Sequence, residues 1–306
     1  MSSSLPPEIL DLIIDHLHDK PTTLKTCCVV SKSWVPRTRR HLFARVEFHA
    51  PQSPVELWKK TFPDPSNSPA YHTHTLSINS TPVTAAGAGM DCWIHSFCNV
   101  ISLRLLHMDP ASLTPFYGFS PTLRSLSLTH VPLDGFDLIC SFPLLEDLAL
   151  VSTPPTSDPD GWNMPLTSPK LTGTLDLRVP GSGCSVARRL VDLPGGLHFA
   201  EIYTLLFFNE NAKSLTDLVL RCSDTLESLT ICYRPKSAFP SAPVTTQHLI
   251  AARRHVHIWV VPLRPLYGHE TQISELCAER VECPMGQHGA PNRQIRKPSI
   301  YRHPPI

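Results

Sequence analysis

The sequence predicts an α+β protein in which a unit of three short helices precedes an α/β solenoid with a parallel sheet. Three observations lead to this prediction. Apolar residues recur at helical spacing between positions 5 and 43. Pairs of apolar residues separated by a single residue recur every 22 to 27 positions from 76 to 231. The 32 prolines are about twice the usual share, which favours many short elements over long helices or strands.

The first helix is indicated by Ile9, Ile13 and Leu17, which are four residues apart and therefore fall on one helical face. Pro6 and Pro7 suit its first turn, where proline removes no helical hydrogen bond. These features predict a short amphipathic helix at the start of the chain.

Two further helices are expected after it. Pro21 is predicted to stop the first helix, and Thr22 or Thr23 to cap a second one. Because Pro36 is tolerated only in an opening turn, the third helix is expected to run from Val35 to Phe43. A unit of about 40 residues is marginal alone, so its surplus apolar groups are expected to need a cover. The main candidates are Leu5, Pro6, Ile9, Val30 and Trp34.

This stretch resembles the F-box. The match consists of Leu-Pro-x-Glu-Ile at 5–9, the Ile/Leu ladder to position 17, Val-x-Lys-x-Trp at 30–34 and the aromatic residue at 43. An F-box docks onto a Skp-type adaptor, which joins it to a cullin–RING ubiquitin ligase. The resemblance implies that the adaptor-binding residues are Leu5, Pro6, Pro7, Glu8, Ile9, Ile13, Val30 and Trp34. The alternative is an unrelated three-helix start.

Residues 53–60 are predicted to form a short helix, because a serine cap, a proline and an acidic residue stand at its start. The proline-rich stretch at 62–69 is expected to be a rigid link. The predicted division of the chain is a helical F-box at 1–48, a helix and linker at 49–72, a solenoid at 73–235 and a divergent tail at 236–306.

Short strands with two apolar residues facing one way recur along the solenoid region. They are centred on Leu76–Ile78, Leu103–Leu105, Leu126–Leu128, Leu148–Leu150, Leu175–Leu177, Ile202–Thr204 and Leu229–Ile231. The strand at 202–204 misses the second apolar residue, because Thr204 stands in its place. One such strand cannot bury its apolar side chains, but stacked parallel strands share a continuous core. The pattern resembles leucine-rich repeats, although the asparagine or cysteine usual after such strands is absent from most of them. A plain mixed α/β domain is the alternative.

Residues between the apolar positions are expected to line the concave face of the solenoid. Solenoids use such faces to hold other macromolecules, so a protein substrate is expected there, and an ordinary solvated sheet face is the alternative. The candidate substrate-facing residues are Arg104, Ser127, Asp147, Asp176, Arg178, Glu201 and Tyr203.

The tail from residue 236 differs in composition. Val256–Val260 alternates like a strand and lies 27 residues after the strand at 229, so an eighth repeat is open. Beyond it periodicity is lost, and residues 293–306 are expected to be disordered.

Composition excludes several classes of function. The net charge of +1 gives no basis for electrostatic capture of nucleic acid or an anionic membrane. No run of eighteen apolar residues and no signal-like N-terminus is present, which predicts a cytoplasmic or nuclear protein. The ten cysteines are then expected to be free thiols in a reducing compartment.

Two motifs leave weak alternatives open. The glycines at 181 and 183 follow a strand and open a helix, as in a dinucleotide loop, but the third glycine is missing. Cys277, Cys283 and His288 could suggest zinc, but their spacing does not match common sites. Neither a nucleophile elbow nor a carboxylate pair stands out, so no catalysis, cofactor or metal is expected.

These observations together predict a non-catalytic substrate-recognition adaptor of an SCF-type cullin–RING ligase. The helical unit would hold the ligase arm, and the repeats would hold the protein to be ubiquitinated. The alternatives are a ligase-independent scaffold or protein-binding module, and an enzyme carrying an N-terminal docking module.

Overall fold

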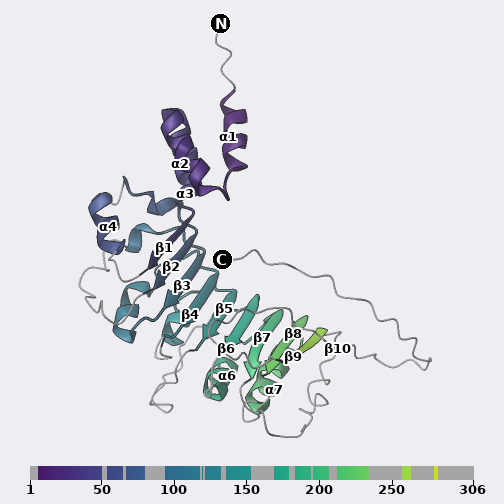
Figure 1. Cartoon of the computed structure of the whole chain (residues 1–306). Helices are drawn as coiled ribbons and strands as arrows, with labels where there is room; N and C mark the ends of the chain where they lie inside the picture. Colours follow the sequence, from purple (N-terminus) through teal and green to yellow (C-terminus); the bar gives the residue numbers. More distant parts are fainter. Residues whose placement is uncertain are drawn as a thin grey trace, which may run out of the picture.

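The computed structural model consists of a small helical unit at the N-terminal end of one long sheet (Figure 1). It describes residues 6–49, 54–64, 67–79, 94–117, 119, 121–131, 136–152, 169–178, 183–193, 196–206, 212–233, 257–262 and 279–281. The α-helices are α1 (Pro7–Asp15), α2 (Pro21–Val30), α3 (Val35–Leu42), α4 (Pro54–Thr61), α5 (Phe136–Cys140), α6 (Gly183–Val191) and α7 (Ala212–Arg221). The 3-10 helices are η1 (Lys32–Trp34), η3 (Pro69–His72), η5 (Ile94–Ser96) and η6 (Pro110–Phe116).

The three predicted N-terminal helices are confirmed as α1, α2 and α3, which pack together. Their common core is small: Ile14, Leu24 and Cys27 are buried, together with Thr38, whose hydroxyl donates to the carbonyl of Trp34. So few apolar groups stabilise the unit only modestly, at about 2 kcal/mol for each fully buried leucine or isoleucine.

The predicted helix ends need correction. α1 ends at Asp15, six residues before the proline that was expected to stop it. Pro21 instead opens α2, whose N-cap is Lys20 without a side-chain cap, so neither Thr22 nor Thr23 caps the helix. The physical reason is that proline is favoured at the first helical position, where its missing N–H and fixed φ cost nothing.

The strands form a single ten-stranded sheet in chain order. They are β1 (Arg45–His49), β2 (Thr75–Asn79), β3 (Ser102–Leu106), β4 (Ser125–Thr129), β5 (Asp147–Val151), β6 (Thr174–Arg178), β7 (Glu201–Leu206), β8 (Ser228–Tyr233), β9 (His257–Pro262) and β10 (Glu279–Val281). Neighbours from β1 to β9 are parallel, and β10 pairs antiparallel with β9. The solenoid with a parallel sheet is therefore confirmed. The further repeat strand that the sequence left open at 256–260 is β9.

Most of the described repeats enter their strand through the same hydrogen-bonded corner, and at β6 the Thr174 amide instead donates to the Asp147 side chain. The carbonyl of Ala44 accepts from the amides of His74 and Thr75, and the carbonyl of His74 accepts in turn from Ile101 and Ser102. The same two-amide pattern recurs at the carbonyls of Ile101, Arg124, Ala200 and, with a longer second bond, Gly173. Threonine hydroxyls add further bonds between neighbouring repeats, from Thr73 to the Phe43 carbonyl, from Thr122 to that of Val100 and from Thr225 to that of Phe199. These corners hold the repeats in register.

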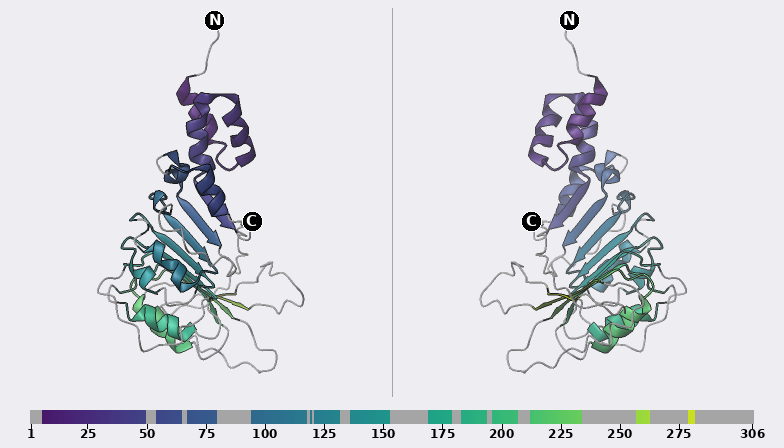
Figure 2. Two further views of the ribbon diagram at one scale, coloured as in Figure 1. Left: turned by 90° about the vertical axis from the view of Figure 1, so that its left-hand side faces the viewer. Right: turned by 90° about the vertical axis from the view of Figure 1, so that its right-hand side faces the viewer.

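The inward side chains of the strands make the core, because alternate residues of β3, β4, β5 and β6 are buried. Helical segments close the other side of this core, and Figure 2 shows α6 and α7 on one side of the sheet. The 23- and 22-residue units return through η6 and the five-residue α5, while the 27-residue units that follow β6 and β7 accommodate α6 and α7.

An aromatic cluster caps the N-terminal end of the core. Trp58 of α4 packs between Phe43, Phe48 and Phe97, with ring centroids 5.8, 5.8 and 5.4 Å away, and Phe62 lies 4.8 Å from it. Because a solenoid end would otherwise expose its core, α4 acts as the cap that the linker sequence did not reveal.

The first strand, β1, was not predicted. It begins three residues after α3 ends, within the range assigned to the helical unit, and pairs Val46 with Leu76 and Phe48 with Ile78. Its signal was weak because valine and phenylalanine replace the paired leucines. As a consequence the helical unit is joined directly to the edge of the sheet.

None of the helices in the described ranges has the length and apolar content needed to span a membrane.

Candidate functional site

The predicted adaptor-binding residues lie on the surface of the helical unit. Pro6, Pro7, Glu8, Ile9, Ile13 and Val30 are exposed, and Trp34 is half-buried in η1, which contacts α1 and α2. Leu5 lies outside the described residues. The structure therefore leaves these apolar side chains open to solvent, with Ile9 43 %, Ile13 46 % and Val30 64 % exposed.

Two exposed apolar residues of this unit were missed. Leu12 of α1 is 59 % exposed and Val29 of α2 is 87 % exposed. A helical wheel drawn from Ile9 would have found Leu12, which follows it by three positions. We call Ile9, Leu12, Ile13, Val29 and Val30 the apolar surface of the helical unit.

Asp15 at the end of α1 fixes that helix against α3. Arg37 Nε donates to Asp15 Oδ1 over 2.6 Å and its Nη2 pairs with Oδ2, while His41 Nε2 lies 2.7 Å from Oδ1. The hydrogen bonds from Arg37 and His41 lower the pKa of Asp15 well below its ordinary value. These contacts fix the position of α1, which carries part of the apolar surface of the helical unit.

The second candidate surface is the open face of the sheet, formed by the outward side chains of β1 to β8. Strand register places Ser77, Arg104, Ser127, Ala149, Asp176 and Tyr203 in one row across β2 to β7. A parallel row two residues earlier holds Ser102, Ser125 and Asp147, then Thr174 and Glu201 in the next strands. Arg178 lies two residues after Asp176 on the same side of β6 and pairs with Val151, so all seven predicted substrate-facing residues lie on this face.

Several of these side chains have partners within the protein. Asp147 Oδ1 accepts from the Thr174 amide over 2.7 Å, so it bridges two repeats. Arg178 Nε donates to Asp176 Oδ1 over 2.8 Å, and its guanidinium lies 4.6 Å from the centre of the Tyr203 ring. The middle of the open face over β6 and β7 is thus already ordered.

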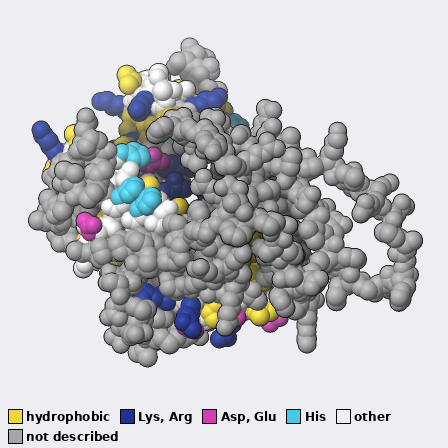
Figure 3. Space-filling model, turned by 60° about the horizontal axis from the view of Figure 1, so that its bottom comes forward, with side chains coloured by type: hydrophobic (Ala, Val, Ile, Leu, Met, Phe, Trp, Pro, Cys, Tyr) yellow, Lys and Arg dark blue, Asp and Glu magenta, His cyan; other side chains and the backbone are white. Residues whose placement is uncertain are grey.

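Histidines gather on the face of the molecule seen in Figure 3. Two histidines stack at successive repeat corners, His107 after β3 and His130 after β4, with centroids 4.6 Å apart and rings 11° from parallel. Both are exposed and both have a positive φ of 53°. Their amides donate to the carbonyls of Thr129 and Val151, which explains the turn that the backbone makes there.

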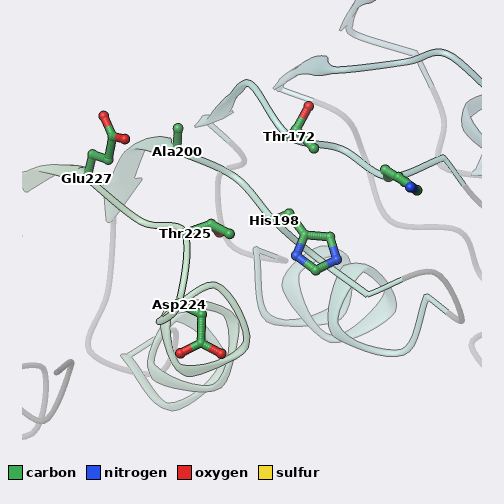
Figure 4. A pocket seen from close by; sticks show the side chains of 7 residues that line it. Thr172, His198, Ala200, Asp224, Thr225 and Glu227 are labelled. Carbon is green, nitrogen blue, oxygen red and sulfur yellow. The ribbon is translucent and has the colours of Figure 1, made fainter. Parts of the chain in front are cut away.

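A polar groove of about 560 Å³ follows the edge where β6, β7 and β8 begin. It is lined by Lys170, Thr172, His198, Ala200, Asp224, Thr225 and Glu227. Figure 4 shows Asp224 and Glu227 pointing away from each other. A general acid and base must both reach one reacting centre, and these side chains instead line a shallow edge.

Cysteines in the core behave as small apolar groups. Burial raises the pKa of the Cys140 and Cys222 thiols to about 11, so they stay protonated and unreactive at neutral pH. Within the described ranges, no three His, Cys, Asp or Glu side chains gather as metal ligands. Cys277, Cys283 and His288, the residues considered for zinc, lie outside those ranges, as do the residues at 181 and 182 of the glycine-containing loop.

No protein-family model, no curated protein and no solved structure matches this chain.

Proposed function

We propose that the protein is a substrate-recognition adaptor of a cullin–RING ubiquitin ligase. Its helical unit docks onto a Skp-type adaptor, and the open face of the sheet binds the protein to be ubiquitinated. One observation carries the proposal: an apolar surface remains uncovered on a helical unit that has little core of its own.

The uncovered surface is concentrated in a small part of the chain. Five of the eleven large apolar side chains that are exposed in the described residues belong to positions 9–30. Exposed apolar groups gathered in this way mark interaction sites more often than scattered ones do. The half-buried Trp34 adds an aromatic anchor, the residue type that dominates binding energy at interfaces.

The sequence motif supports the same assignment. Pro6, Glu8, Ile9 and Val30, which carry the F-box resemblance, are exposed. α3 leads directly into β1, so a partner bound to the helical unit would be held close to the first repeats. That arrangement suits a protein that presents one partner to another.

The proposal is tested by co-purification with a Skp-type adaptor. Ile9→Asp combined with Ile13→Asp is expected to abolish co-purification, because it places two charges in an apolar interface. The double change Leu5→Ala, Pro6→Ala should weaken it as well. Circular dichroism should show an unchanged repeat domain, whose core does not involve these residues.

A matched control is Leu220→Asp on α7, a leucine that is 48 % exposed far from the helical unit in the sequence. It should leave adaptor binding intact. Adaptor recovery by the Ile9→Asp, Ile13→Asp variant at the level of the unchanged protein would overturn the proposal.

A different measurement distinguishes a ligase-independent scaffold from a ligase adaptor. Immunoprecipitation of the full chain should recover the cullin together with the adaptor if the ligase forms. Recovery of the adaptor without the cullin would favour the scaffold.

A further inference from the structure

We infer that the open face of the sheet recognises an extended polypeptide segment carrying an acidic and a basic side chain about six residues apart. The acidic group would lie over Arg104, and the basic group over Glu201. The inference rests on the proposed protein-binding role of this face and specifies the ligand chemistry.

Two charged side chains of the open face, Arg104 and Glu201, are available to a ligand. Arg104 on β3 and Glu201 on β7 are exposed, and neither has an ion-pair or hydrogen-bond partner in the described part of the chain. By contrast, Asp147, Asp176 and Arg178 between them are held by partners within the protein. Arg104 and Glu201 are therefore the charges in this part of the face that remain available to a ligand.

Serine residues surround Arg104 on the open face. Its row neighbours are Ser77 and Ser127, and the earlier row adds Ser102 and Ser125. Ser77 is buried, whereas the half-buried Ser102, Ser125 and Ser127 leave the guanidinium accessible, and their hydroxyls can donate to an oxyanion. The surroundings suit a carboxylate or a phosphate and offer no acid of their own on β2, β3 or β4.

The distance between Arg104 and Glu201 sets the spacing of the two charges in the ligand. β3 and β7 are four strand positions apart in the sheet, and strands lie roughly 4.8 Å apart, so the charges are separated by about 20 Å when the two-residue offset is included. An extended chain covers about 3.3 Å per residue, which gives a spacing of about six residues. A helical ligand would need about thirteen residues for the same span.

A peptide-display selection on the full-length protein tests the inference. Random 15-residue peptides should enrich for Asp or Glu and Lys or Arg separated by five to seven positions. Arg104→Gln or Glu201→Gln should each weaken binding of a selected peptide about fivefold, and added salt should weaken binding to the unchanged protein. A phosphoserine peptide in place of the acidic residue distinguishes phosphate from carboxylate recognition.

Charge reversal gives the sharper result, because it does not depend on peptide direction. With Arg104→Glu the selected peptides should carry two basic residues at the same spacing, and with Glu201→Arg two acidic ones. The matched controls are Arg188→Glu on α6 and Asp217→Arg on α7, both exposed on helices that pack on the covered side of the sheet. These controls should select the same peptides as the unchanged protein.

Selected peptides without the charge spacing, a pattern that survives both reversals, a helical spacing, or no binders at all would each overturn the inference. Adaptor co-purification depends on α1 and α2 and is measured separately, so it reports on the proposed function independently.

Discussion

The helical unit and the repeat sheet differ in how completely they bury their apolar side chains. The helical unit buries four side chains and leaves Leu12, Val29 and Val30 more than half exposed. In the sheet, β3 and β4 bury Leu103, Leu105, Leu126 and Leu128 almost completely. The difference teaches that a repeat can cover its neighbour's leucines with its own, whereas three short helices without neighbours leave apolar groups available for a partner.

The largest expected effect comes from the sheet core. Leu126→Ala should destabilise the repeat domain by about 2–5 kcal/mol, because the fully buried side chain leaves a cavity. Leu12→Ala in the helical unit should change stability by less than about 0.5 kcal/mol. Urea unfolding followed by circular dichroism measures both, and equal losses would contradict the contrast between the two regions.

A second test concerns a close approach within the repeats. A Cβ on Gly173 would lie 2.1 Å from Asp147 Oδ1, so Gly173→Ala should cost about 1–3 kcal/mol. The double variant Gly173→Ala, Asp147→Ala should be less destabilised than the two single losses combined, since the clash is removed. Additive losses in thermal unfolding would show that the carboxylate is not the obstacle.

The contacts of Asp15 with Arg37 and His41 should stabilise the helical unit by a smaller amount, about 1 kcal/mol, because Asp15 is one-third exposed. Its pKa is lowered on folding, so the stabilisation is complete above its unfolded pKa near 3.9 and is lost as pH falls through the folded value. Asp15→Asn should remove this acid sensitivity of the helical unit, whereas Asp19→Asn, an exposed neighbour, should leave it. Thermal melts between about pH 2 and pH 6 measure the difference.

The smallest effect is expected at the strained repeat corners. His130 has a φ of 53°, a conformation that glycine adopts without strain. His130→Gly should therefore stabilise the repeat domain, by about 0.5 kcal/mol. His95, whose φ is not positive, provides the control, because His95→Gly should give no gain. A fall in midpoint on His130→Gly would mean that the imidazole stack with His107 outweighs the strain.

Periodic features were predictable from the sequence. Leu103, Leu126 and Leu148 lie in strands at the expected places, because their alternation with polar residues is itself the signal of a half-buried strand. The helix ends near Pro21, the strand β1 and the capping role of Trp58 were not predictable. Each depends on a neighbour that is close in space and carries no local pattern.

The candidate site divides in the same way. Placing Arg104 and Glu201 on one face followed from alternation along their strands. That Asp147 and Asp176 are held by partners within the protein, while Arg104 and Glu201 are not, depends on contacts between different repeats. Leu12 and Val29 were missed because their exposure depends on how the three helices pack.

The order of the three N-terminal helices and of the strands from β2 onward, and the direction in which the leucines of these strands point, were determined by the sequence alone, because both follow from local spacing along the chain. Only the tertiary structure decided which charges are paired, which glycine is required and which apolar groups are left uncovered. The physical reason is that these properties arise from contacts between residues far apart in the chain, and no single segment encodes them.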